Sequence, residues 1–141
     1  MNLNFEMVQE QKISFASTPE NITLVEKLVN DICANSSIYE DYYGNILVAL
    51  TEAVNNAIQH GNKLDAAKAV DVGWTTENDR LKVTVSDHGP GFDFSNLPDP
   101  TNPENLEKPK GRGVFLMRNL ADNIEFFDEG RTVQLEFNLK A

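Results

Sequence analysis

The candidate chemistry of this chain lies in three groups of polar residues and glycines. Glu52, Asn56 and His60 recur every fourth residue within the stretch from Leu47 to Gly61, so on a helix they would form one row. Asp87–Gly91 reads D-H-G-P-G, and Gly111–Gly113 reads G-R-G. A carboxylate and an amide one turn apart can accept a proton and ligate a hard cation. Glycine-rich turns let a ligand approach the backbone closely.

The first group lies on a predicted helix that begins near Asp41 and stops at Gly61. Its apolar residues recur at spacings of three and four and form one stripe, namely Tyr43, Ile46, Leu47, Leu50, Val54, Ala57 and Ile58. The row of Glu52 and Asn56 lies roughly opposite this stripe. An ordinary amphipathic helix with a solvated polar face is therefore the alternative interpretation, and only the two glycine-rich segments argue against it.

Bulk composition restricts the class of protein. The 141 residues are 40% hydrophobic, which is enough for one core, and we expect a single domain over 1–141. A formal net charge of −10 argues against a nucleic-acid partner. The lone Cys33 excludes an internal disulfide and fits a reducing cytosol, where it is more typical of a small buried residue than of a reactive thiol. With no long apolar window and no signal-peptide pattern, the sequence predicts a cytoplasmic protein without a membrane segment.

Alternating and helical patterns predict the remaining elements. A helix capped by Ser17 or Thr18, with Pro19 in its first turn, runs to about Asn35. A second helix spans Gly113–Asn119, and its buried contacts would be Val114, Leu116, Met117 and Leu120. Strands are predicted over residues 9–17, 70–74, 81–85, 124–128 and 132–139, the last two joined at Glu129-Gly130. Strands in hairpins with helices between them predict an α+β two-layer sandwich, with a mixed, mostly antiparallel sheet covered by helices on one face.

The three groups, in this order, resemble the nucleotide-binding boxes of the GHKL (histidine-kinase-like) ATPase superfamily. The resemblance extends to its anti-sigma factor serine/threonine-protein kinase branch through E-A-V-N-N-A-I-Q-H-G, P-D-P-T-N-P-E-N-L and G-R-G-V-F-L-M-R-N-L-A-D. The resemblance as a whole covers nearly the whole chain. The resemblance implies the Bergerat-type ATP-binding fold, which is also an α/β sandwich.

The resemblance assigns the Asp87 box to adenine. The Asp87 carboxylate would accept a hydrogen bond from the exocyclic amine of the base. Gly89 and Gly91 can take positive φ and let the flat ring approach the backbone closely. Thr132 would assist through water. A turn-forming aspartate, two turn glycines and a plain strand threonine are the alternative.

The other two boxes would hold the phosphates. Gly111 and Gly113 precede the predicted helix, so backbone amides there form an anion site, to which Lys110 and Arg112 would add charge unless they are merely solvated. The resemblance assigns Mg²⁺ to Asn56, and Glu52 would accept a proton from the attacking group or only orient that group. Residues 94–110 contain four prolines and are predicted to be a lid over the phosphates.

Two functional classes remain open, and both use ATP and Mg²⁺. The first is a serine-protein kinase that phosphorylates a STAS-type anti-anti-sigma protein and binds a sigma factor in partner switching. The chain lacks the phosphoacceptor hairpin of a sensor kinase, so its substrate would be another protein. The second is an ATP-dependent protein-binding module without phosphotransfer, and the presence of Glu52 favours the kinase over it. A homodimer stays open as a further assembly.

Overall fold

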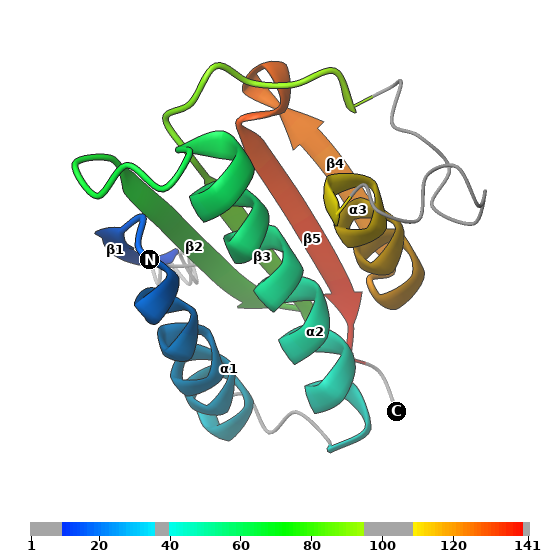
Figure 1. Ribbon diagram of the computed structural model, residues 1–141. Coiled ribbons are helices and arrows are strands. Elements are labelled where there is room, and N and C mark those ends of the chain that lie inside the picture. The colour runs from blue at the N-terminus through cyan, green and yellow to red at the C-terminus, as the bar shows by residue number, and fades with distance from the viewer. Residues whose placement is uncertain (1–9, 36–39, 95–108, 140–141) are drawn as a thin grey trace, which may run out of the picture.

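The computed structural model describes residues 10–35, 40–94 and 109–139, which form a layer of helices in front of a sheet (Figure 1). In chain order the first elements are β1 (Gln11–Ala16), a 3₁₀ turn (Pro19–Ile22), α1 (Thr23–Asn35), α2 (Glu40–Asn56), a π-helical turn (Ala57–Gly61), β2 (Ala69–Glu77) and β3 (Arg80–Ser86). They are followed by α3 (Pro109–Leu120), β4 (Asn123–Phe127), a 3₁₀ turn (Asp128–Gly130) and β5 (Thr132–Asn138). Helices α1, α2 and α3 lie on the same face of the sheet. The predicted α+β two-layer sandwich is confirmed.

The five strands lie in the order β1-β2-β3-β5-β4. Each neighbouring pair is antiparallel, so across the described strands the sheet lacks the parallel component that a mixed sheet would have. The register aligns Val72, Val85 and Val133 across three strands. Successive side chains of a strand point to opposite faces, so this row and its neighbours at every second residue face the helices.

The core lies between these strand residues and the apolar stripe of α2. Ile46, Leu50, Val54 and Ile58 are buried as predicted, whereas Tyr43 is only half-buried. On α3, Val114 and Met117 are buried, but Leu116 was predicted to be buried and is 37% exposed. Leu116 points away because Val114 and Met117 already supply the face of a short helix that meets the core.

Helix α1 begins differently from the prediction. Pro19 does open the helical segment, but its first turn is a 3₁₀ turn and the Thr18 side chain makes no capping hydrogen bond. The Ser17 hydroxyl donates instead to the carbonyl oxygen of Lys68, 51 residues away. Ser17 therefore makes a tertiary hydrogen bond instead of the helix-capping bond that local sequence rules predict.

Burial raises the pKa of the Cys33 thiol, which disfavours the reactive thiolate and fits a packing role.

Helix α2 offers a direct test of the core. Leu50 is fully buried, and Leu50→Ala should lower the free energy of unfolding by about 2–5 kcal/mol, because it removes apolar contacts and leaves a cavity. Val48 lies on the same helix and is 42% exposed, so Val48→Ala should change the free energy of unfolding by less than about 0.5 kcal/mol. Urea unfolding followed by circular dichroism measures both. Equal losses for the two variants would contradict this placement of α2.

None of the helices within residues 10–35, 40–94 and 109–139 combines the length and apolarity that crossing a bilayer requires.

Candidate functional site

The polar row of α2 is covered by α3. Glu52 and Asn56 are half-buried, and both contact the backbone of Gly113. A Cβ atom added at Gly113 would lie 2.9 Å from Asn56 Nδ2 and 3.0 Å from Glu52 Oε2. Glycine is therefore the residue that lets α3 come this close to the row. The interpretation of Glu52 and Asn56 as a freely solvated face is wrong for this fold.

The G-R-G segment lies inside α3, although the sequence analysis predicted that it would precede the helix. Pro109 is the first residue of α3, a position that proline favours because its missing N–H would be unpaired there anyway. The backbone amides of Lys110, Gly111 and Arg112 fall in the first turn, where no intrahelical acceptor reaches them. This turn is still suited to bind an anion, but the amides that would bind it belong to the N-terminus of a helix and not to a loop before the helix. Arg112 is exposed, and the lid predicted for residues 94–110 lies mostly outside the described residues.

The Asp87 loop leaves the end of β3 and folds back on itself. Asp87 Oδ1 accepts a hydrogen bond from the backbone N–H of Gly89 at 2.8 Å, and the Asp87 N–H donates to the carbonyl oxygen of Arg131 at 2.9 Å. Gly91 has the predicted positive φ, at +81°. Gly89 does not use this conformational freedom, because its φ is not positive. Close packing explains why residue 89 is a glycine, because a Cβ atom there would lie 1.8 Å from the carbonyl oxygen of Gly61.

A small cavity joins the end of α2 to this loop. Its volume is about 30 Å³, and its lining includes Asn56, Asp87, Phe92, Met117 and Arg131. A carboxylate among apolar walls suits a flat heteroaromatic ring that carries an amine. The present volume holds about two water molecules, so a purine would enter only after lining side chains move. One wall of the cavity is aromatic, and there the Phe92 ring packs edge-on against Phe126 with centroids 5.4 Å apart.

Thr132 does not join the residues around this cavity. Its hydroxyl lies 2.9 Å from Ser86 Oγ, its partner in the register of β3 and β5. Val85 and Val133, the next residues on each strand, line the cavity. Alternation along the strands therefore turns Thr132 toward the face of the sheet that the helices do not cover.

Arg131 is a residue of the site that no sequence pattern identified. Its Nε donates to the carbonyl oxygen of Gly89 at 2.7 Å, and its Nη2 donates to that of Pro90 at 3.3 Å. Nη1 reaches back to the carbonyl oxygen of Asp128 at 3.2 Å. Arg131 thus ties the Asp87 loop to the hairpin before β5. Its position directly after the Glu129-Gly130 turn was the one available signal, and it does not identify a partner 42 residues away.

The helical segment that begins with α2 ends at Gly61 as predicted, but its last turn, Ala57–Gly61, is π-helical. The backbone N–H of Asn62 donates to the carbonyl oxygen of Ala57 at 2.8 Å, a bond five residues back. This turn brings Gly61 against the loop, because a Cβ atom at Gly61 would lie 2.3 Å from the carboxyl carbon of Asp87. The wide turn at the end of α2 therefore meets the carboxylate directly.

Gly61→Ala should displace the Asp87 carboxylate, because the added methyl group would overlap it. If Asp87 binds adenine, ADP affinity measured by calorimetry should fall by about tenfold or more, approaching the loss of one hydrogen bond to a charged group. Gly44→Ala on the same helix is the matched control, since a Cβ atom there meets nothing within 4 Å. Unchanged ADP affinity in Gly61→Ala would show that the carboxylate does not need its present position.

Comparison with known proteins agrees with this geometry. The histidine kinase-like ATPase domain matches residues 15–137. The serine-protein kinases RsbW of Bacillus cereus (strain AH187) and of Bacillus anthracis are each 28% identical over 135 residues, which cover 91% of this chain and 84% of each relative.

Among solved structures, the RsbU and RsbW domains of a Mycobacterium tuberculosis protein superpose with a TM-score of 0.67 at 18% identity, which supports the fold alone. That alignment covers 93% of this chain and 32% of the mycobacterial chain. The chain therefore belongs to the histidine kinase-like (GHKL) ATPase superfamily, within which it resembles the anti-sigma factor serine kinase branch.

Proposed function

We propose that this protein is an ATP-dependent serine-protein kinase that phosphorylates a STAS-type anti-anti-sigma protein and binds a sigma factor. The observation that carries the proposal is the meeting of three segments. Asn56 shares the cavity with Asp87, and Asn56 and Glu52 both contact α3 at Gly113. The residues proposed to contact adenine, to ligate the metal and to accept the proton thus lie along one path that leads to the N-terminus of α3.

The residues present fit ATP in their chemistry. Asp87 would accept the adenine amine, with Gly89 and Gly91 keeping the backbone of the loop close to the ring. The first-turn amides of α3, from Lys110 to Arg112, would bind phosphate oxygens. Asn56 lies beside Gly113 and offers a neutral oxygen, which suits Mg²⁺ that keeps most of its waters. When bound there, Mg²⁺ would neutralise part of the phosphate charge.

Glu52 has the role that distinguishes a kinase from a binding module. Its carboxylate would accept the proton of the substrate serine hydroxyl as the serine oxygen forms its bond to the γ-phosphorus. The bond between that phosphorus and the oxygen of ADP breaks in the same step, which leaves phosphoserine and ADP. Helix α3 packs over Glu52 and would limit water at this point, so that hydrolysis does not compete with transfer. We place this activity in the cytoplasm.

Label transfer tests the proposal directly. The protein is incubated with Mg²⁺, γ-labelled ATP and the STAS proteins of the same organism, and label on serine of one of them is the expected result. Glu52→Gln is the control that separates this activity from a contaminating kinase. ATP binding without label transfer to any STAS protein would contradict the kinase and leave an ATP-dependent binding module.

A further inference from the structure

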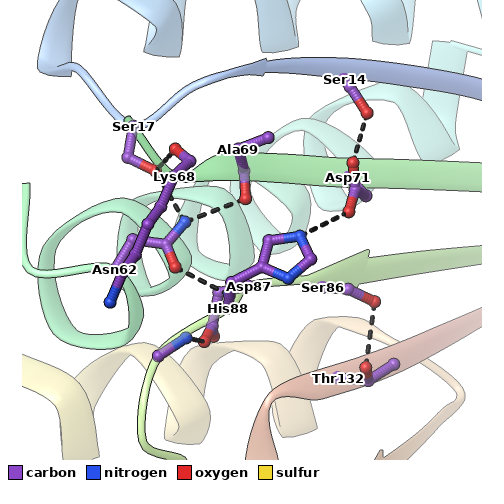
Figure 2. A network of polar contacts seen from close by, with 11 residues as sticks. Ser14, Ser17, Asn62, Lys68, Ala69, Asp71, Ser86, Asp87, His88 and Thr132 are labelled. Carbon is purple, nitrogen blue, oxygen red and sulfur yellow. Dashed lines mark hydrogen bonds and ion pairs between the residues drawn. The ribbon is translucent and has the colours of Figure 1, made fainter. Parts of the chain in front are cut away.

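Asn62 is a buried polar residue that joins three segments of the chain. Its side chain is 1% exposed and is fully paired. Nδ2 donates to Ser17 Oγ at 2.6 Å and to the carbonyl oxygen of Ala69 at 3.0 Å. Oδ1 accepts the backbone N–H of His88 at 2.7 Å. Figure 2 shows Asn62 between the end of β1, the start of β2 and the Asp87 loop.

The residue before Asn62 meets the same loop through packing. Gly61 lies against the Asp87 carboxylate, and its carbonyl oxygen fills the space where a side chain at Gly89 would stand. The Gly61-Asn62 pair therefore contacts Asp87, His88 and Gly89 in succession. The packing contacts of Gly61 with Asp87 and Gly89 limit how closely the loop can approach the end of α2. The hydrogen bond from His88 to Asn62 is the attractive contact that holds the loop there. That bond joins residues 26 apart in sequence.

We propose that Asn62 is a positioning residue for nucleotide recognition, and this inference rests on the proposed function. Asn62 holds the His88 N–H, which fixes the peptide that follows Asp87 and so aims the carboxylate at the adenine amine. Its two donated bonds hold the amide between Ser17, which follows β1, and Ala69, the first residue of β2. Asn62 touches neither nucleotide nor substrate, so its effect on the base passes through Asp87.

The measurement must distinguish an effect on the orientation of the Asp87 carboxylate from an effect on the stability of the fold. ADP is compared with purine riboside 5′-diphosphate, which has the same ring and phosphates but lacks the exocyclic amine. The wild-type protein should prefer ADP by roughly 10- to 150-fold, the range for a hydrogen bond to a charged group. Asn62→Ala should reduce this preference by about three- to tenfold, in line with the loss of one neutral hydrogen bond that holds the loop. Its affinity for the analogue should stay the same.

Ser17→Ala is the matched control. It removes one anchor of the same buried network and leaves the bond between Asn62 and His88. Its unfolding midpoint in urea should fall, while its preference for ADP stays at the wild-type value. Equal weakening of ADP and the analogue by Asn62→Ala would mean that Asn62 is only structural, and the inference would be overturned.

A second pair of variants tests the same bond from the loop side, should Asn62→Ala not fold. His88→Ala and His88→Pro both lose the contact between the imidazole Nε2 and Asp71 Oδ2, which measures 3.0 Å. Only proline also loses the backbone N–H that Asn62 holds. The preference for ADP should fall in His88→Pro and persist in His88→Ala. A preserved preference in His88→Pro would contradict the inference.

Failure of the proposed function looks different in the same titrations. A wild-type protein that binds neither diphosphate, or binds both equally, would remove the adenine role of Asp87. A wild-type preference for ADP that survives in Asn62→Ala and His88→Pro would keep that role and remove Asn62 from it.

Discussion

Glu52→Gln should lower the rate of phosphoryl transfer to the STAS protein by about 10²- to 10⁴-fold, the usual contribution of a general base. The amide keeps the size of the carboxylate and its place beside Gly113, so the packing of α3 should not change. It cannot accept the serine proton. ATP affinity should therefore stay within a factor of about two while single-turnover transfer collapses.

Asn56→Ala is the variant that distinguishes the loss of a proton acceptor at Glu52 from the loss of a metal ligand. Asn56 and Glu52 both lie against Gly113, and loss of either would read as a dead enzyme in a transfer assay alone. If Asn56 holds the metal, its alanine variant should lose the Mg²⁺-dependent part of ATP affinity together with transfer. Transfer at full rate in Glu52→Gln would remove Glu52 from the mechanism and leave the nucleotide site intact.

Asp87→Ala should weaken ATP and ADP alike, because both carry the same base. Loss of a hydrogen bond to a charged group costs about 1.5–3 kcal/mol, which corresponds to roughly 10- to 150-fold in affinity. Calorimetry with ADP and without metal isolates this term from the phosphate contacts. The variant also loses the bond from the Gly89 N–H, so part of the effect will come from a looser loop.

Asp65→Ala is the matched control for that experiment. Asp65 is an exposed aspartate that likewise accepts a backbone N–H two residues ahead, from Ala67 at 2.9 Å, but it does not line the cavity. ADP affinity should be unchanged in this variant. If Asp87→Ala also kept its ADP affinity, the carboxylate would have no part in recognising the base.

Patterns within single segments determined much of the architecture. Alternation of apolar residues predicted the strands, including the hairpin at Glu129-Gly130, and the three- and four-residue spacing predicted α2 with Leu50 and Val54 in the core. These patterns are reliable because burial repeats with the period of the element itself. The order of the three boxes in the sequence also indicated the GHKL superfamily. The roles assigned to Glu52, Asn56 and Asp87 remain predictions.

Only the tertiary structure decided how the boxes meet. Gly113 lies beside Glu52 within a helix that starts earlier than the G-R-G pattern suggested, and Gly89 is needed for its closeness to Gly61 rather than for its φ. The Ser17 hydroxyl donates to the carbonyl oxygen of Lys68 instead of capping the helix, as its local sequence favours. Asn62 accepts a hydrogen bond from His88, 26 residues away in the Asp87 loop. Local sequence carries the period of a helix or strand but no record of which distant backbone group a side chain will reach. Such contacts exist only once the sheet has brought the end of α2 against the end of β3.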